Sequence, residues 1–137
     1  MKKKLKCILL IDDDHSVNFL NEVIIKRSDC TESVKVCTGG HQALEYLRGT
    51  GNKDYVLPDL IFLDINMPLM NGWEFLEEYR KLENHLKTQV IIVMLTTSLN
   101  PDDESRSRRI PEINDFVNKP ITPQLLNNVL KKYFVNF

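Results

Sequence analysis

The sequence has no long apolar run and no excess of charge of either sign. Lysine and arginine together number 18 and aspartate and glutamate 19, for a formal net charge of −1. A nearly neutral molecule has no overall field to attract nucleic acid or an anionic membrane. The apolar run Cys7–Ile11 is too short for a membrane span or a signal peptide, and it ends at three aspartates. We therefore expect a function that resides in a local site, with no nucleic-acid or membrane partner.

Cysteine is scarce and its spacing is irregular. The three cysteines, Cys7, Cys30 and Cys37, are odd in number and form no CxxC motif. This favours reduced thiols over a disulfide framework and predicts a cytoplasmic location. The three histidines are scattered without metal-ligand spacing. Internal repeats and low-complexity tracts are also missing. A length of 137 residues is close to the commonest size of one domain and leaves no room for a second of ordinary size, so residues 1–137 are expected to form a single domain.

Short apolar segments alternate along the chain with segments of helical periodicity. Three of the predicted strands are almost continuously apolar, which is typical of strands covered on both faces, whereas the second and fifth are mixed, as edge strands are. Between the second helix and the third strand, Gly49–Leu57 is predicted to be a surface loop. The predicted strands are Cys7–Ile11, Val34–Cys37, Leu60–Leu63, Val90–Leu95 and Ile113–Val117.

A predicted helix follows each strand, and all but the fourth carry apolar residues at helical spacing. In the first predicted helix, Val17, Leu20 and Ile24 recur at intervals of three and four residues and are expected to form its apolar face. The segment Pro101–Arg109 has almost no apolar face and is predicted to be a short, exposed helix. The order β-α repeated five times predicts an α/β fold, with a parallel sheet and helices on both faces.

Polar residues stand at the carboxyl ends of the predicted strands, where ligands of such folds bind. Asp12 and Asp13 follow the first strand, Asp64 the third, Thr96 the fourth and Lys119 the fifth. Gathered carboxylates repel one another unless a cation lies among them. An open, oxygen-rich site favours Mg²⁺, and a lysine and a hydroxyl beside it could hold the oxygens of a phosphoryl group. The residue types therefore predict a phosphoryl-transfer site.

The block Asp64–Gly72 resembles the phospho-acceptor motif of the receiver domains of two-component response regulators: an aspartate, then Met-Pro, then a glycine eight positions on. The acid pair, the threonine and the pair Lys119–Pro120 complete the family pattern over essentially the whole chain. The resemblance is to stand-alone, chemotaxis-type regulators, and the long loop before the third strand is similar to the phytochrome-associated subgroup. It implies a flavodoxin-like (βα)5 fold with a five-stranded parallel sheet in the order 2-1-3-4-5.

The resemblance also implies how Mg²⁺ would be held. Asp64 would accept the phosphoryl group, and Asp13 and Asp64 would ligate the metal through their side chains. The backbone carbonyl of Asn66 would be the third protein ligand, and Asp12 would hold a metal-bound water. These roles make Mg²⁺ the one cofactor expected for this chain.

The remaining family positions concern phosphoryl contacts and switching. Thr96 would donate its hydroxyl to a phosphoryl oxygen, and Lys119, expected to precede a cis bond to Pro120, would pair with Asp64 and then with the phosphoryl group. The aromatic switch position, three before the lysine, is often tyrosine in the family and is Phe116 here. Thr97 is larger than the usual alanine or glycine. These two departures bear on switching strength and dephosphorylation rate.

The function that the resemblance implies is a signalling switch that catalyses only its own phosphorylation and dephosphorylation. Its donor would be a sensor histidine kinase or a phosphotransfer protein, and its output would be contact with a downstream protein that the sequence does not name. Homodimerisation is left open. Two other functions compete with this one. An aspartate-nucleophile phosphatase needs a second acid two residues after the nucleophile, where this chain has Asn66. An unphosphorylated scaffold would usually lack an acid, the threonine or the lysine, and this chain keeps them all.

Overall fold

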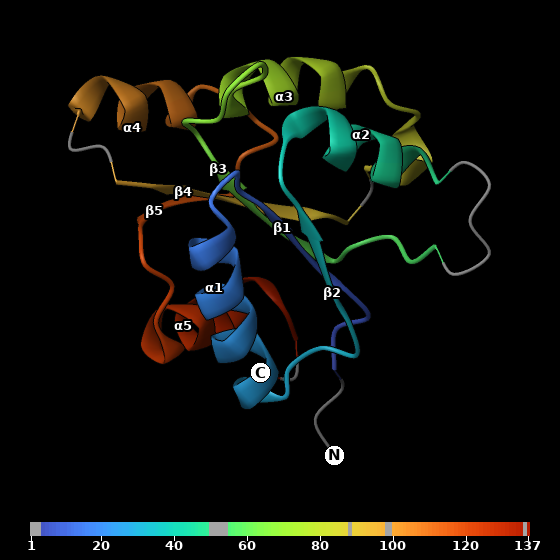
Figure 1. Cartoon of the computed structure of the whole chain (residues 1–137), viewed down its shortest axis with the longest axis vertical. Coiled ribbons are helices and arrows are strands. Elements are labelled where there is room, and N and C mark those ends of the chain that lie inside the picture. The colour runs from blue at the N-terminus through green and yellow to red at the C-terminus, as the bar shows by residue number, and fades with distance from the viewer. Residues whose placement is uncertain (1–3, 50–54, 88, 98–99, 136) are drawn as a thin grey trace.

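Strands and helices alternate along the chain (Figure 1) in a computed structural model that describes residues 4–49, 55–87, 89–97, 100–135 and 137. Much of the predicted loop Gly49–Leu57 and the start of the chain lie outside these residues. The elements are β1 (Ile8–Ile11), α1 (His15–Ser28), β2 (Val34–Cys37), α2 (Gly40–Arg48), β3 (Leu60–Asp64), α3 (Gly72–Arg80), a 3₁₀ turn (Asn84–Leu86), β4 (Ile91–Thr96), α4 (Pro101–Arg108), β5 (Asp115–Asn118) and α5 (Pro123–Tyr133).

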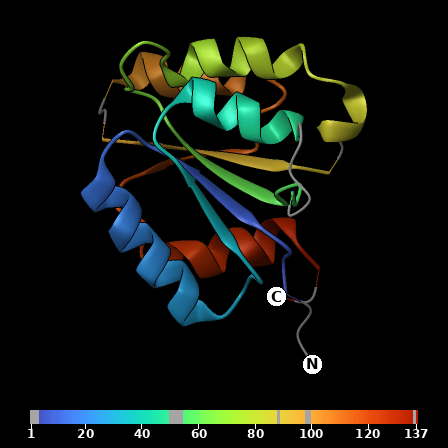
Figure 2. The same cartoon turned by 45° about the vertical axis from the view of Figure 1, so that its right-hand side comes forward.

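The strands form one parallel sheet in the order β2-β1-β3-β4-β5, which confirms the predicted order and the two predicted edge strands. Helices α1 and α5 cover one face, and α2, α3 and α4 lie on the other (Figures 1 and 2). Among the described residues, no helix has both the length and the apolar character that crossing a membrane requires.

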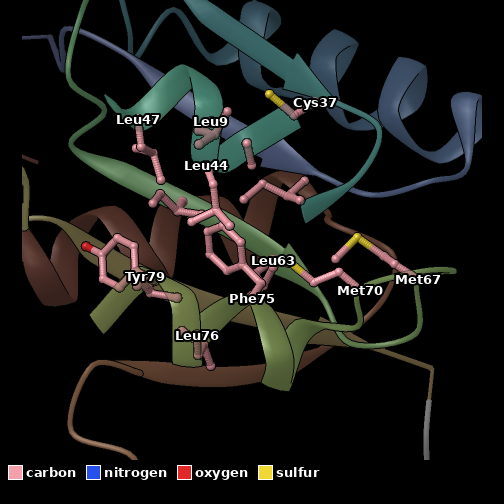
Figure 3. Close-up of a cluster of buried hydrophobic side chains, with 14 of the residues drawn as sticks. Leu9, Cys37, Leu44, Leu47, Leu63, Met67, Met70, Phe75, Leu76 and Tyr79 are labelled. Atoms are coloured by element: carbon pink, nitrogen blue, oxygen red, sulfur yellow. The ribbon is translucent and has the colours of Figure 1, made fainter. Parts of the chain in front are cut away.

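Alternate residues of the central strands pack into two separate hydrophobic cores, one on each face of the sheet. Leu9, Ile11 and Leu63 point into the cluster beneath α2 and α3, where Phe75 and Tyr79 pack (Figure 3). Their neighbours Ile8, Leu10 and Phe62 enter the cluster beneath α1 and α5. Because successive side chains of a strand point to opposite faces, a strand buried on both faces must be apolar at every position. This explains the continuous apolar runs in the sequence.

The fifth strand begins two residues later than predicted, at Asp115 instead of Ile113. The amide of Ile113 donates to the carbonyl of Ile110 and so closes a turn. The side-chain oxygen of Asn114 then accepts the amide of Ile92, 2.9 Å away. A side chain thus takes the place of a backbone partner beside β4, and the regular ladder starts only at the next residue.

The apolar face predicted for the first helix is only partly right: Ile24 is half-buried and packs against the cluster beneath α1 and α5, but Leu20 does not. Leu20 is 59% exposed, and its neighbour Phe19 is 65% exposed. The buried residues of α1 are Asn18, Asn21 and Ile25. These three also recur at intervals of three and four, so the periodicity was present, but two polar residues occupy it. The inner face of α1 is therefore polar toward the start of the helix and apolar further along.

Cys7, Cys30 and Cys37 are free, as predicted, and all three are buried. Burial raises the pKa of all three thiols, and that of Cys37 to about 11. They are therefore protonated at neutral pH and behave as small apolar residues of the core.

Candidate functional site

Three aspartates meet at the carboxyl ends of β1 and β3. The parallel register pairs Ile11 with Leu63, which places Asp12 beside Asp64 at the same edge of the sheet. Both are buried, whereas Asp13 is exposed. One carboxylate oxygen from each of Asp12, Asp13 and Asp64 lies within 4.8 Å of the other two. The structure thus brings together the acids that the sequence singled out.

Lys119 reaches this acid cluster from the loop after β5. Its Nζ lies 2.6 Å from Asp12 Oδ2 and 3.0 Å from Asp64 Oδ1. Its backbone amide donates to the carbonyl of Thr96 at 2.8 Å, and the bond to Pro120 is cis, as expected. The family resemblance implied a pairing of Lys119 with Asp64 alone, and the shorter contact of Lys119 is with Asp12.

The electrostatics of the cluster follow from burial and from these contacts. Burial raises the pKa of the Asp64 carboxyl, the hydrogen bond from Lys119 opposes this, and the charge of Asp12 adds to the rise. Burial by itself would lower the pKa of Lys119, but hydrogen bonds to Asp12 and Asp64 outweigh it and raise that pKa. The ammonium group is therefore fully charged at neutral pH and lies between the two buried carboxylates.

The loop after β1 is held by its own side chains. Asp14 begins α1, and its carboxylate accepts the amides of Ser16 and Val17, which confirms its predicted capping role. The Asp14 amide in turn donates to Asp12 Oδ1 at 3.0 Å. With Lys119 on Oδ2, both carboxylate oxygens of Asp12 are engaged.

The loop after β3 folds back tightly on the phospho-acceptor candidate. A side chain at Gly72 would place its Cβ 2.6 Å from the carbonyl oxygen of Asp64, so only glycine fits there. Met67 and Met70 turn into the core (Figure 3), while Leu69 is 95% exposed with a φ of 67°. The loop thus buries its two methionines and presents Leu69 to solvent.

The two candidate switch residues lie on adjacent strands. Thr96, the last residue of β4, is fully buried, whereas Thr97 is exposed. Phe116 pairs in register with Met94 of β4, two residues before Thr96, and is half-buried. The structure therefore places Phe116 where a change at Thr96 could reach it through one neighbouring strand.

One buried residue at the site was missed by the sequence analysis. Asn18 of α1 donates from Nδ2 to the backbone carbonyl of Asp12, 2.8 Å away. The only signal in the sequence was its place in the stripe Asn18, Asn21, Ile25, because a search for apolar periodicity passes over asparagine. Arg106 is exposed, as predicted for its helix, and its guanidinium stacks 4.5 Å from the centre of the Trp73 ring.

The donor set fits a hard divalent cation. Three carboxylates face one ammonium group, which leaves an excess of two negative charges when all are ionised. Carboxylate oxygens with one exposed side are the ligands that Mg²⁺ prefers, because it keeps several of its waters. Within the described residues, the scattered His15, His41 and His85 take no part in a cluster of this kind.

Replacement of Asp64 by asparagine is expected to stabilise the metal-free protein, increasingly so as the pH rises. Burial raises the pKa of Asp64 in the folded state, so the folded protein keeps a proton that the unfolded chain releases above pH 3.8. The stability that this proton confers is complete below that pH and is lost as the pH rises through the folded-state pKa. Urea unfolding of both proteins in chelator, from acid to neutral pH, measures the effect. Parallel stability profiles would contradict it.

The comparisons with known proteins agree with this geometry. The response regulator receiver domain matches residues 8–131. A two-component response regulator from Cytophaga hutchinsonii is 35% identical with a TM-score of 0.82, and the match covers 96% of this chain and 98% of that one. The bacteriophytochrome response regulator RtBRR is 31% identical with a TM-score of 0.79, covering 97% and 80%. The similarity to RtBRR agrees with the resemblance to the phytochrome-associated subgroup that the long loop before the third strand suggested.

A longer relative places the same domain in another context. Hybrid signal transduction histidine kinase C of Dictyostelium discoideum is 30% identical over 138 residues, which are 93% of this chain but 10% of the kinase. The chain therefore corresponds to a small part of that protein. Together with the matched residues, the sheet order and the cluster of three aspartates and a lysine, these similarities show that the chain belongs to the response regulator receiver domain family of two-component signalling.

Proposed function

We propose that this chain is a phospho-aspartate switch that accepts a phosphoryl group on Asp64 and changes its binding to another protein. The observation that carries the proposal is the contact of Lys119 with both Asp12 and Asp64, beside the exposed carboxylate of Asp13. This arrangement offers a carboxylate nucleophile and a fixed positive charge at one open edge of the sheet. Positioning and charge neutralisation of this kind are what phosphoryl transfer requires of a protein.

Asp64 acts as the nucleophile in the proposed transfer. One of its carboxylate oxygens attacks phosphorus, the bond from phosphorus to the donor breaks, and the donor departs with the bonding electrons. The ammonium group of Lys119, which pairs with the Asp64 carboxylate before the transfer, pairs with the phosphoryl oxygens after it. The hydroxyl of Thr96 donates a hydrogen bond to one of these oxygens. Mg²⁺ bound by Asp13, Asp64, the Asn66 carbonyl and, through water, Asp12 would neutralise charge on the transferred group.

The phosphoryl donor, the domain organisation and the cellular location of the switch are part of the same proposal. The donor is a sensor histidine kinase or a phosphotransfer protein, and residues 1–137 act as one receiver domain. The two cores share a single sheet, which supports the single domain. The three free, buried cysteines support a cytoplasmic location.

Incubation with acetyl phosphate and Mg²⁺ tests the proposal. Intact mass spectrometry should show one added phosphoryl group, and chelation of Mg²⁺ should prevent the addition. Hydroxylamine should remove the group, because it cleaves an acyl phosphate and leaves phosphoserine intact. An unchanged mass under conditions that label an established receiver domain would refute the proposed function.

Removal of the Asp13 charge is expected to weaken Mg²⁺ binding by about tenfold or more, as loss of a metal-site carboxylate or its support typically does. Asp13→Asn is the test variant, and Asp14→Asn is the control, since it removes the same charge one residue away and keeps an oxygen for the cap. Calorimetry with MgCl2 measures both affinities. The Trp73 ring, buried in the first turn of α3, offers a fluorescence signal as well. Equal losses in the two variants would contradict a direct role for Asp13.

Phosphorylation is expected to change the face formed by α4, β5 and α5. Of α4, only Ser107 is buried, so the helix can shift at low cost. Helix α4 and β5 border a hollow of about 330 Å³ that Phe116 and Arg108 line. If Thr96 moves toward the phosphoryl group, Phe116 can turn inward beside it. Coupling between the site and this face should amount to about 1–3 kcal/mol.

Amide NMR shifts with and without beryllofluoride, a phosphoryl mimic, map this change. Shifts should spread from the phosphorylation loops to Arg106, Arg108, Arg109 and Phe116, while the exposed side of α2 stays constant as an internal control. Because Arg106 stacks on Trp73, the tryptophan fluorescence should change in parallel. Shifts confined to the loops would refute this route to the output face.

A further inference from the structure

The inner face of α1 carries asparagine where the packing of a helix on a sheet calls for apolar side chains. Asn18 and Asn21 are each 3% exposed, as buried as the apolar residues around them. Buried amides cost free energy unless their polar atoms find partners. Asn18 satisfies this need only in part, and its partner belongs to the phosphorylation site.

The Asn18 side chain holds the backbone between two of the site aspartates. Its Nδ2 donates to the carbonyl oxygen of Asp12 over 2.8 Å, in a fully buried hydrogen bond. That carbonyl belongs to the peptide unit that joins Asp12 to Asp13. Fixing the plane of this unit fixes the position of the Asp13 Cα and the axis about which its side chain can turn, because the peptide is planar and rigid. The Asp13 side chain is exposed and makes no side-chain hydrogen bond within the described part of the chain.

The other end of the same amide is unsatisfied. Asn18 Oδ1 is buried and has no hydrogen-bond partner among the described residues. An unpaired buried acceptor destabilises a fold, and leucine at this helix position would avoid it. Local features that cost stability are expected chiefly at functional sites. The carbonyl of Asp12 thus has a donor at the expense of an unpaired oxygen in the core.

We propose that Asn18 is a positioning residue of the phosphorylation site, which orients the Asp12–Asp13 peptide so that the Asp13 carboxylate meets the metal. This inference rests on the proposed function, in which Asp13 ligates Mg²⁺. Asn18 touches neither metal nor phosphoryl group and acts through the backbone of Asp12. Such supporting hydrogen bonds commonly set the affinity of a metal site.

Asn18→Leu, which keeps the size and removes the donor, tests the proposal against Asn21→Leu, an equally buried asparagine one turn along α1. Calorimetry with MgCl2 alone should give a dissociation constant about tenfold higher for Asn18→Leu and close to wild type for Asn21→Leu. In the metal-free protein, the amide NMR signals of Asp13 and Asp14 should broaden or shift only in the first variant. Urea unfolding measures any general loss of stability in either protein.

If a leucine variant does not fold, the same measurements are made on Asn18→Ala and Asn21→Ala, since alanine removes the hydrogen-bond donor without adding bulk. Equal Mg²⁺ affinities and equal Asp13 amide signals within the Asn18 and Asn21 pair would overturn the role of Asn18. That result leaves the proposed function intact if the wild-type protein binds Mg²⁺ and is phosphorylated. Failure of the wild-type protein in both assays refutes the proposed function instead, and the metal-free NMR comparison still reports on Asn18.

Discussion

Asp64→Asn is expected to abolish labelling by acetyl phosphate. The amide of asparagine has almost the shape of the carboxylate but is not a nucleophile of comparable strength, so no acyl phosphate forms. The other site acids cannot replace it, because Lys119 and the Asp14 amide hold both oxygens of Asp12, and Asp13 lies at the exposed rim. Intact mass after incubation with the donor and Mg²⁺ should show the unmodified chain alone.

Asp59→Asn is the matched control for this loss. Asp59 directly precedes β3, whereas Asp64 is its last residue, so the two aspartates lie at opposite ends of the same strand. The Asp59 carboxylate accepts a hydrogen bond from the backbone amide of Lys6. The control variant should be labelled like the wild-type protein. Labelling of Asp64→Asn at the wild-type level, or loss of labelling in Asp59→Asn, would remove Asp64 as the acceptor.

Lys119→Met is expected to destabilise the metal-free protein by about 3 kcal/mol at neutral pH, the lower end of the range for loss of one partner from a buried ion pair. The side chain is 13% exposed, and Asp12 and Asp64 are 5% and 7% exposed at their side chains, so water screens the group poorly. Without the ammonium, the two buried carboxylates repel each other. Urea unfolding at neutral pH in chelator measures the loss.

Two further measurements separate this effect from simple loss of packing. Mg²⁺ should recover part of the stability of Lys119→Met, and lowering the pH should recover more, because protonation removes the repulsion between the carboxylates. Lys132→Met is the control: Lys132 pairs with Asp115 at 3.5 Å and is 63% exposed, and such surface pairs contribute little to stability because water screens them. A Lys119→Met variant that is as stable as this control, or that does not respond to Mg²⁺ and pH, would contradict the electrostatic role.

The pattern of apolar residues by itself determined the class of fold and the two edge strands, and the family resemblance supplied the full strand order. Strands buried on both faces must be apolar throughout, so β1, β3 and β4 could be identified from the sequence as central strands. The mixed sequences of β2 and β5 identified these two as edge strands. Parallel strands all end at one edge, so the residues that follow them could be assigned to one site. The acids, the threonine and the lysine were found in this way, because strand ends have fixed places in the fold.

The sequence could not determine which polar groups touch which. The contact between Lys119 and Asp12 joins residues 107 positions apart, and it depends on how the β5–α5 loop lies over β1. The stacking of Arg106 on Trp73 joins α4 to α3 in the same manner. No regular spacing in the sequence predicts either contact, because each joins two loops or two helices that come together only when the sheet is packed.

The buried face of α1 shows most clearly what only the tertiary structure decided. Hydrophobicity predicted Val17, Leu20 and Ile24, yet the helix turns Asn18, Asn21 and Ile25 inward and leaves Leu20 in solvent. The start of α1 lies against the β1–α1 loop, whose Asp12 carbonyl takes the Asn18 amide as its donor. The need of one backbone carbonyl for a hydrogen-bond donor is a property of the folded loop, which the pattern of apolar residues in the sequence does not contain.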